Sequence, residues 1–180
     1  SLKSNPSTPL RPELTRLAIV LLFTTGIRRG ELLNLTEADY NPQEATLHIR
    51  QTKFYKSRLL PVHEGIGKEI EQYLNARAKL KLPSSPTTPL MWNATRGGRA
   101  YTGTGISYCI KPLLHQCGIK AASGLTPRIH DFRHSFAVNA LLRWYRAGSE
   151  VDAKLPLLAT YLGHCSALST HHYLHFIEPM

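Results

Sequence analysis

Long apolar runs, paired cysteines and acidic residues are scarce in this sequence, and each shortage argues against a class of protein. The longest uninterrupted apolar run spans residues 17–23, far short of the roughly 20 residues that cross a bilayer. The three cysteines, Cys109, Cys117 and Cys165, are odd in number and have no CxxC spacing, which argues against a disulfide framework and favours a reducing cytoplasm. Residues 1–12 are polar and contain proline, so they do not read as a secretory segment.

The shortage of acidic residues leaves a strong positive charge. There are 12 Asp and Glu against 22 Lys and Arg, which gives a formal net charge of +10 and a pI of about 9.8. Such a balance favours a polyanionic partner, with nucleic acid as the first choice and an anionic membrane as the second. Many basic soluble proteins bind neither, so the charge alone does not decide between them.

The length and pattern predict one mostly helical α+β domain with a small antiparallel sheet. A chain of 180 residues, 42% hydrophobic, can bury one continuous core. We expect a linker over residues 1–12 and a single domain over residues 13–180. Periodicity predicts helices at 13–24, 29–35, 67–82, 104–117, 129–147, 154–162 and 168–176. Alternating residues at 46–50 and 57–62 predict a β-hairpin.

Residues 25–33, TGIRRGELL, combine a glycine break, two arginines and a helix start. The free N–H groups and partial positive charge of a helix N-terminus suit phosphate binding. The ordinary interpretation is a capped helix with surface arginines. Spacing alone does not choose between Arg28 and Arg29 as the phosphate ligand.

Residues 129–137, IHDFRHSFA, place His130 and Arg133 three positions apart, on one face of a helix. Histidine can exchange a proton near neutral pH, and arginine offers a fixed cation with a fork for phosphate oxygens. The ordinary interpretation is a helix that carries incidental polar residues.

Three further features are weaker in isolation. Tyr173 lies nine residues after His164, and a tyrosine with a pKa of about 10 is a poor nucleophile unless a base or cations stabilise its phenolate; in a helix such a residue most often packs. Lys53 lies in the hairpin turn, where a lysine is most often solvent-exposed. Residues 83–89 predict a loop, and residues 96–99, Arg96-Gly97-Gly98-Arg99, predict a second loop, which is basic.

Taken together and in this order, the residues resemble the tyrosine site-specific recombinases of the phage-integrase family. The TGxRxxEL box of the family reads TGIRRGELL here and contains Arg28, and the HxLRH box reads HDFRH and contains His130 and Arg133. His164 ends an LGH box, Tyr173 follows at the family's offset in STHHYLH, and Lys53 stands eight residues before Pro61. The resemblance extends over about residues 14–176.

The resemblance implies a metal-independent and ATP-independent DNA strand transferase that needs no cofactor. Tyr173 is the implied nucleophile, which forms a 3′-phosphotyrosyl bond. Arg28, Arg133 and His164 are implied to bind the phosphate, His130 to accept the tyrosine proton, and Lys53 to protonate the leaving oxygen. Glu31 is implied to orient an arginine. We expect additional DNA contacts at Arg29, Lys56, Arg58, Arg96 and Arg99.

The resemblance also implies the partners. Double-stranded DNA is the expected substrate, four protomers are expected in the synaptic complex, and the isolated chain can be a monomer; no membrane partner is expected. Residues 1–12 are then the linker from an N-terminal core-binding domain. Residues 141–148 and the later Leu155-Pro156 resemble recombinases of transposons and other mobile elements, which implies a bacterial cytoplasmic protein.

Three other interpretations stay open. A type IB topoisomerase has a similar catalytic set and relaxes supercoils without site preference. A DNA-binding regulator could keep the fold without the chemistry. A zinc site could use some of the residues His164, Cys165, His171, His172 and His175, although no CxxC or HExxH spacing supports it.

Overall fold

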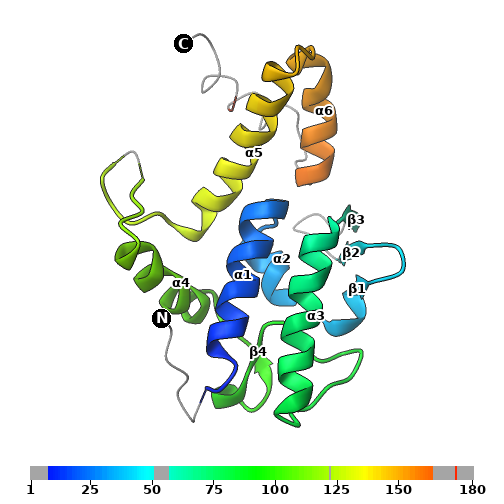
Figure 1. The fold of residues 1–180 in the computed structure, drawn as a ribbon, viewed down its shortest axis with the longest axis vertical. Coiled ribbons are helices and arrows are strands. Elements are labelled where there is room, and N and C mark those ends of the chain that lie inside the picture. The colour runs from blue at the N-terminus through cyan, green and yellow to red at the C-terminus, as the bar shows by residue number, and fades with distance from the viewer. Residues whose placement is uncertain (1–7, 51–56, 122, 164–172, 174–180) are drawn as a thin grey trace.

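The computed structural model describes residues 8–50, 57–121, 123–163 and 173. It contains helices α1 (Arg11–Thr25), α2 (Arg29–Asn34), α3 (Glu64–Lys79), α4 (Gly103–Gln116), α5 (Ile129–Arg146) and α6 (Val151–Leu162), with short 3₁₀ turns at Glu37–Asp39 and Ala94–Arg96 (Figure 1). The predicted mostly helical α+β architecture is confirmed.

Helix α1 is central, and α3, α4 and α5 all pack against it. Seven of its residues are buried, including the leucines of the apolar run. It begins at Arg11, two residues before the predicted start, because proline is tolerated in the first turn of a helix and Pro12 lies there. It ends at Thr25, and Gly26, which caps it, has a left-handed φ of 61°. A side chain at this position would also press on Phe136 of α5, with Cβ only 2.6 Å from Cδ1.

The predicted hairpin is present and belongs to a three-stranded antiparallel sheet. Strand β2 (Thr46–Ile49) pairs with both β1 (Tyr40–Asn41) and β3 (Arg58–Pro61), and Leu47 lies opposite Leu60. Both leucines are buried, so this face of the sheet joins the main core. Strands β4 (Trp92–Asn93) and β5 (Arg99–Ala100) form a second, two-stranded sheet that the sequence did not predict.

The last two helices form a second, smaller core. Helices α5 and α6 lie side by side at one end of the molecule, beyond the end of α1 (Figure 1). Their apolar side chains enclose Tyr173, which is 3% exposed. The predicted helix at 168–176 lies outside the described residues except at Tyr173, which is in a turn. Helix α3 begins and ends three residues before the predicted bounds of 67–82, and Leu80, just after its end, is 46% exposed.

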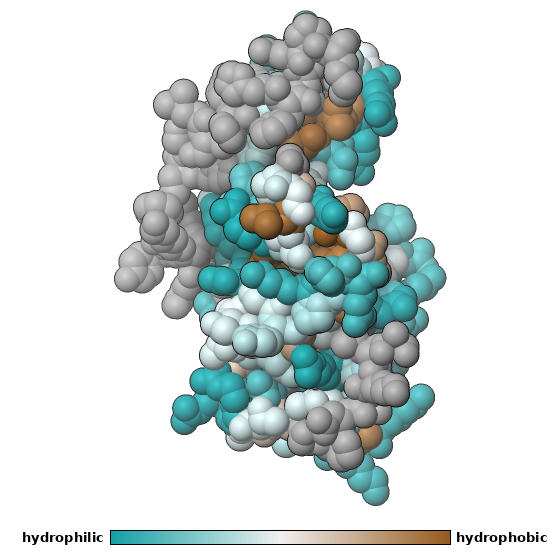
Figure 2. All heavy atoms as spheres, turned by 90° about the vertical axis from the view of Figure 1, so that its left-hand side faces the viewer, coloured by the Kyte–Doolittle hydropathy of each residue, from teal (hydrophilic) through white to brown (hydrophobic). Residues whose placement is uncertain are grey.

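Among the residues coloured in Figure 2, hydrophilic and intermediate side chains predominate on the face shown, and hydrophobic ones appear in small patches. Among the residues that the structure describes, no helix combines the length and apolarity that crossing a membrane would need.

Candidate active site

Three arginines from distant parts of the chain converge on the C-terminal end of α6. Each donates a hydrogen bond to one of three consecutive backbone carbonyls, which at a helix end have no partner within the helix and carry partial negative charge. The pairs are Arg58 with Tyr161 (2.9 Å), Arg133 with Leu162 (2.7 Å) and Arg28 with Gly163 (2.6 Å). The backbone that leads directly into His164 is therefore fixed from three sides.

Arg133 is the most deeply placed of the three. It is 2% exposed, and its second Nη atom donates to the carbonyl of Gly26, at 2.8 Å. Burial lowers the pKa of Arg133 to about 10, and the nearby charge of Arg28 acts in the same direction. The guanidinium therefore stays charged at neutral pH. It uses two of its five N–H groups on these carbonyls, so donors are left for a ligand.

Glu31 joins Arg28 to Arg58. Its carboxylate, 6% exposed, accepts hydrogen bonds from the Arg28 side chain (2.8 Å) and from both Nη atoms of Arg58 (2.9 and 2.8 Å). It also accepts one from the backbone N–H of Arg28, which caps α2. Burial by itself raises the pKa of Glu31, but the hydrogen bonds and charges of Arg58 and Arg28 outweigh it, and the net pKa is lowered. Glu31 is thus an anion that holds two cations in place.

His130 lies in the first turn of α5, one turn before Arg133. The helix starts with a capping box in which the Arg128 N–H donates to Asp131 at 2.8 Å. The His130 side chain is exposed, yet the protein around it removes part of its hydration. This desolvation lowers the pKa of His130, and the charges of His134 and Arg133 lower it further. The imidazole is therefore neutral at pH 7 and can accept a proton.

Tyr173 lies between α5 and α6, beside these groups. Its ring contacts that of His134 edge to face, at 5.5 Å between centroids, and His134 in turn contacts His130 at 4.7 Å. Burial raises the pKa of Tyr173, while the positive charges of Arg133 and Arg28 oppose that rise. The phenol is protonated at neutral pH, so a reaction at its oxygen needs a base.

The structure brings together four of the seven residues assigned to the catalytic set or its support, Arg28, Glu31, Arg133 and Tyr173, with His130 one helical turn away. Lys53 and His164 lie outside the described residues, as does Lys56. Every role remains a prediction.

The expected DNA contacts divide into two groups. Arg29 is exposed beside the start of α4, where a Cβ on Gly103 would lie 3.0 Å from its Cζ. Arg96 and Arg99 are exposed at the β4–β5 turn. Arg58, in contrast, directs its guanidinium inward to Glu31 and Tyr161.

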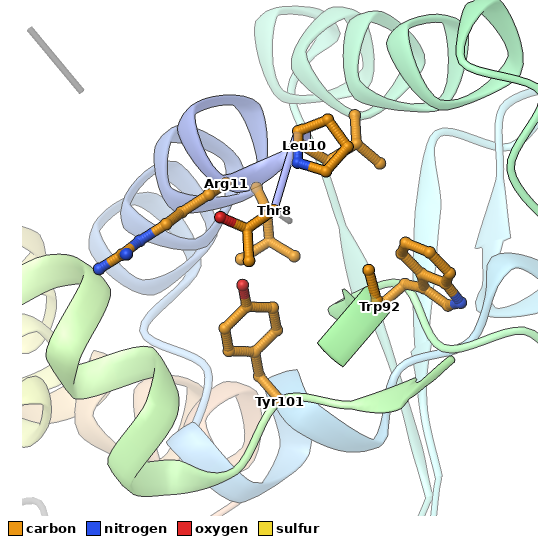
Figure 3. Close-up of a pocket in the computed structure, with 8 residues that line it drawn as sticks. Thr8, Leu10, Arg11, Trp92 and Tyr101 are labelled. Carbon is orange, nitrogen blue, oxygen red and sulfur yellow. The ribbon is translucent and has the colours of Figure 1, made fainter. Parts of the chain in front are cut away.

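A groove that the sequence analysis did not predict lies beside the arginine cluster. It is lined by Glu31, Asn34, Leu35, Thr36, Asp39 and Arg50. Arg50 forms an ion pair with the buried Asp39, at 2.5 Å. A smaller cavity lies elsewhere, between the N-terminal end of α1 and the β4–β5 segment, where the Tyr101 hydroxyl points toward Thr8 (Figure 3). None of the arginine cluster lines this second cavity.

Metal ligands do not gather in the described part of the chain, where no three His, Cys, Asp or Glu side chains form a group that could hold an ion. The histidines and Cys165 that suggested zinc lie outside that part.

Comparison with known proteins identifies the family. The sequence profile of the Phage integrase family matches residues 4–178, and the chain belongs to this family. It is 38% identical over 166 residues to an integrase/recombinase, y4rB, of Sinorhizobium fredii. That alignment covers 92% of this chain and 52% of the relative. It is 30% identical over 158 residues to the tyrosine recombinase XerA of Pyrococcus furiosus, with 88% and 49% covered. The chain thus spans about half the length of these relatives.

The fold agrees with solved structures of this class. The XerH site-specific recombinase bound to a palindromic difH substrate, in a post-cleavage complex, superposes with a TM-score of 0.73 over 98% of this chain and 45% of that one. At 22% identity, this likeness shows a shared fold.

Proposed function

We propose that this chain is the catalytic part of a site-specific recombinase that cuts and rejoins double-stranded DNA through a 3′-phosphotyrosyl bond at Tyr173. The observation that carries the proposal is the position of Tyr173 within the electrostatic reach of Arg133 and Arg28, which are themselves fixed on the carbonyls of α6. Cations beside a tyrosine stabilise its phenolate form and the charge that develops on an attacked phosphate.

In the proposed cleavage step the Tyr173 oxygen attacks a backbone phosphorus. The new Tyr173 O–P bond forms as the bond from phosphorus to the 5′-oxygen breaks. The tyrosine proton passes to His130, which is neutral at pH 7 because its pKa is lowered, and Lys53 protonates the leaving 5′-oxygen. A 5′-hydroxyl of another strand then reverses these steps and reseals the DNA, so no external energy source is needed.

Arg28 and Arg133 bind the non-bridging oxygens in this scheme. Arginine suits the task because its fork matches two phosphate oxygens. The Arg28 side chain is 31% exposed whereas Arg133 is 2% exposed, so the phosphate approaches from the side of Arg28. His164 is assigned a hydrogen bond to the same phosphate.

The partners follow from the same proposal. The net charge of +10 suits a DNA substrate, and the XerH site-specific recombinase, which shares this fold, was solved bound to a palindromic difH substrate. We assign Arg29, Arg96, Arg99 and Lys56 to DNA contacts outside the cleavage centre. We further propose a mobile element in a bacterial cytoplasm as the source, a core-binding domain joined through residues 1–12, and four protomers at synapsis from chains that are monomers in solution.

Covalent trapping tests the proposal. The protein, with Tyr173→Phe and Arg133→Ala alongside, is incubated with a pool of nicked duplexes at low salt and then denatured. An adduct that forms with the wild type and is lost in Tyr173→Phe is the expected result. An adduct that persists in Tyr173→Phe would contradict the assignment. DNA binding without any adduct would favour a regulator, and plasmid relaxation without a preferred site would favour a topoisomerase.

A further inference from the structure

We infer that Arg58 is a positioning residue of the cleavage centre, which holds Glu31 and the C-terminal end of α6 in register and does not contact DNA. The inference rests on the proposed function. It assigns to β3 a task that neither charge nor position in the sequence indicates, because the residue lies among other basic residues of the hairpin.

The contacts of Arg58 are those of a side chain held by protein. Its Nε donates to the Tyr161 carbonyl at 2.9 Å, and its two Nη atoms donate to the two oxygens of Glu31 at 2.9 and 2.8 Å. The side chain is 13% exposed and the carboxylate 6%. A planar two-point pair of this kind fixes direction as well as distance, so Glu31 cannot turn without moving Arg58.

Through these contacts Arg58 connects α2, α6 and β3, each of which lies close in sequence to a proposed catalytic residue. Glu31 also binds Arg28, Tyr161 lies three residues before His164, and Arg58 itself follows Lys53 by five residues. Arg50 lies directly after β2, at the same end of the hairpin as Arg58, and forms an ion pair with buried Asp39. The two strands that lead to and from residues 51–56 are therefore each anchored by an arginine–carboxylate pair.

The guanidinium of Arg58 passes close to Gly163. Gly163 closes α6 with a φ of 68°, and a Cβ there would lie 2.8 Å from Arg58 Nη1 and 3.2 Å from Arg28 Nη1. Two cationic side chains thus pass over a residue without a side chain. Lysine in place of Arg58 can supply the charge but cannot reach both oxygens of Glu31 and the Tyr161 carbonyl together.

The test compares Arg58→Met and Arg58→Lys with a matched control, Arg16→Met. Arg16 also binds both oxygens of a glutamate, Glu69, at 2.7 and 2.6 Å, but its side chain is 68% exposed, between α1 and α3. For each protein we measure the DNA dissociation constant at several salt concentrations. On duplexes selected by wild-type trapping, we measure the single-turnover rate of adduct formation at saturating DNA.

A positioning role predicts that both Arg58 variants lower the cleavage rate by on the order of a hundredfold, since displacements of about 1 Å have effects of that size. In both Arg58 variants the DNA affinity and its salt dependence should stay close to wild type. In the control Arg16→Met the cleavage rate, the DNA affinity and its salt dependence should all stay close to wild type. A DNA contact predicts the reverse: Arg58→Met weakens binding and lowers the salt slope by about one, while Arg58→Lys keeps most activity. That second pattern would overturn the inference.

Two further measurements keep the test decisive. Arg58→Met leaves the buried carboxylate of Glu31 with fewer partners, and the double variant Glu31→Gln with Arg58→Met removes that charge. The double variant should fold and still cleave slowly. Hydrogen exchange of the amides at 158–163 should rise about tenfold in Arg58→Met and not in Arg16→Met. If the wild type forms no adduct, the proposed function fails by itself, and unchanged exchange in Arg58→Met would refute the positioning role independently.

Discussion

Replacing Arg133 perturbs stability as well as chemistry, and the structure gives the size of the effect. The guanidinium is 2% exposed and donates hydrogen bonds to the Gly26 and Leu162 carbonyls at 2.8 and 2.7 Å. A hydrogen bond from a charged group contributes about 1.5–3 kcal/mol. Arg133→Ala removes two such bonds and leaves two carbonyls without their partner. We therefore expect a loss of about 3–5 kcal/mol in the free energy of unfolding.

That loss is a large fraction of the roughly 5–15 kcal/mol that stabilises a typical domain. Arg133→Lys keeps the charge but can reach only one carbonyl at a time, so we expect a smaller loss of about 1.5–3 kcal/mol. Urea unfolding followed by circular dichroism measures both variants. Arg143→Met, on an exposed position of the same helix, serves as the control and should stay within about 0.5 kcal/mol of wild type.

A loss of less than about 1 kcal/mol in Arg133→Ala, typical of an exposed arginine whose bonds water can replace, would contradict this expectation. The expected loss also affects how trapping experiments are interpreted. An Arg133→Ala protein that forms no adduct is informative only at temperatures where its circular dichroism shows that it is folded.

Three other predictions follow from the site. The pKa of His130 is lowered from its ordinary 6.5, so the rate of adduct formation should rise with pH through a step below pH 6.5. In His130→Gln this step should be absent. A step that remains in His130→Gln would contradict the role of His130 as the base. The pKa of Glu31 is lowered from 4.5, so its stabilising effect is complete above pH 4.5 and is lost as the pH falls through the folded-state value. Urea titrations at several pH values should therefore show that the free energy of unfolding falls more steeply with acid for wild type than for Glu31→Gln. Parallel pH dependences of the two proteins would contradict this role of Glu31. Gly163→Ala places a Cβ on a residue with left-handed φ, 2.8 Å from Arg58 Nη1, and should lower the free energy of unfolding by about 1–3 kcal/mol. Gly124 also has a left-handed φ, of 77°, but a Cβ there would meet no atom within 4 Å. Gly124→Ala should therefore lower the free energy of unfolding by less.

The long helices and the hairpin could be predicted from periodicity because each carries a sustained pattern. Helix α5 begins at the predicted Ile129, and α6 ends at the predicted Leu162. Strands β1, β4 and β5 have two residues each, which is too short for an alternation to appear. They form because the neighbouring chain supplies hydrogen-bond partners, and a local pattern contains no such information.

The site was only partly predictable for a related reason. Sequence boxes identified Arg28 and Arg133, and the structure places both on the end of α6. The role of Arg58 depends on a bond to Tyr161 across 103 positions of sequence, so the residue reads as one more basic side chain of a hairpin. The left-handed Gly163 that lets the arginines approach is likewise visible only once the helices are in place.

The most direct measurement of the central claim is the chemical identity of the bond between protein and DNA. Trapped adducts are digested with nuclease and protease, and the peptide that carries a nucleotide is sequenced by mass spectrometry. The account predicts a nucleotide 3′-phosphate on Tyr173 and a free 5′-hydroxyl on the released strand. A nucleotide attached to any other residue, or joined through its 5′-phosphate, would contradict it.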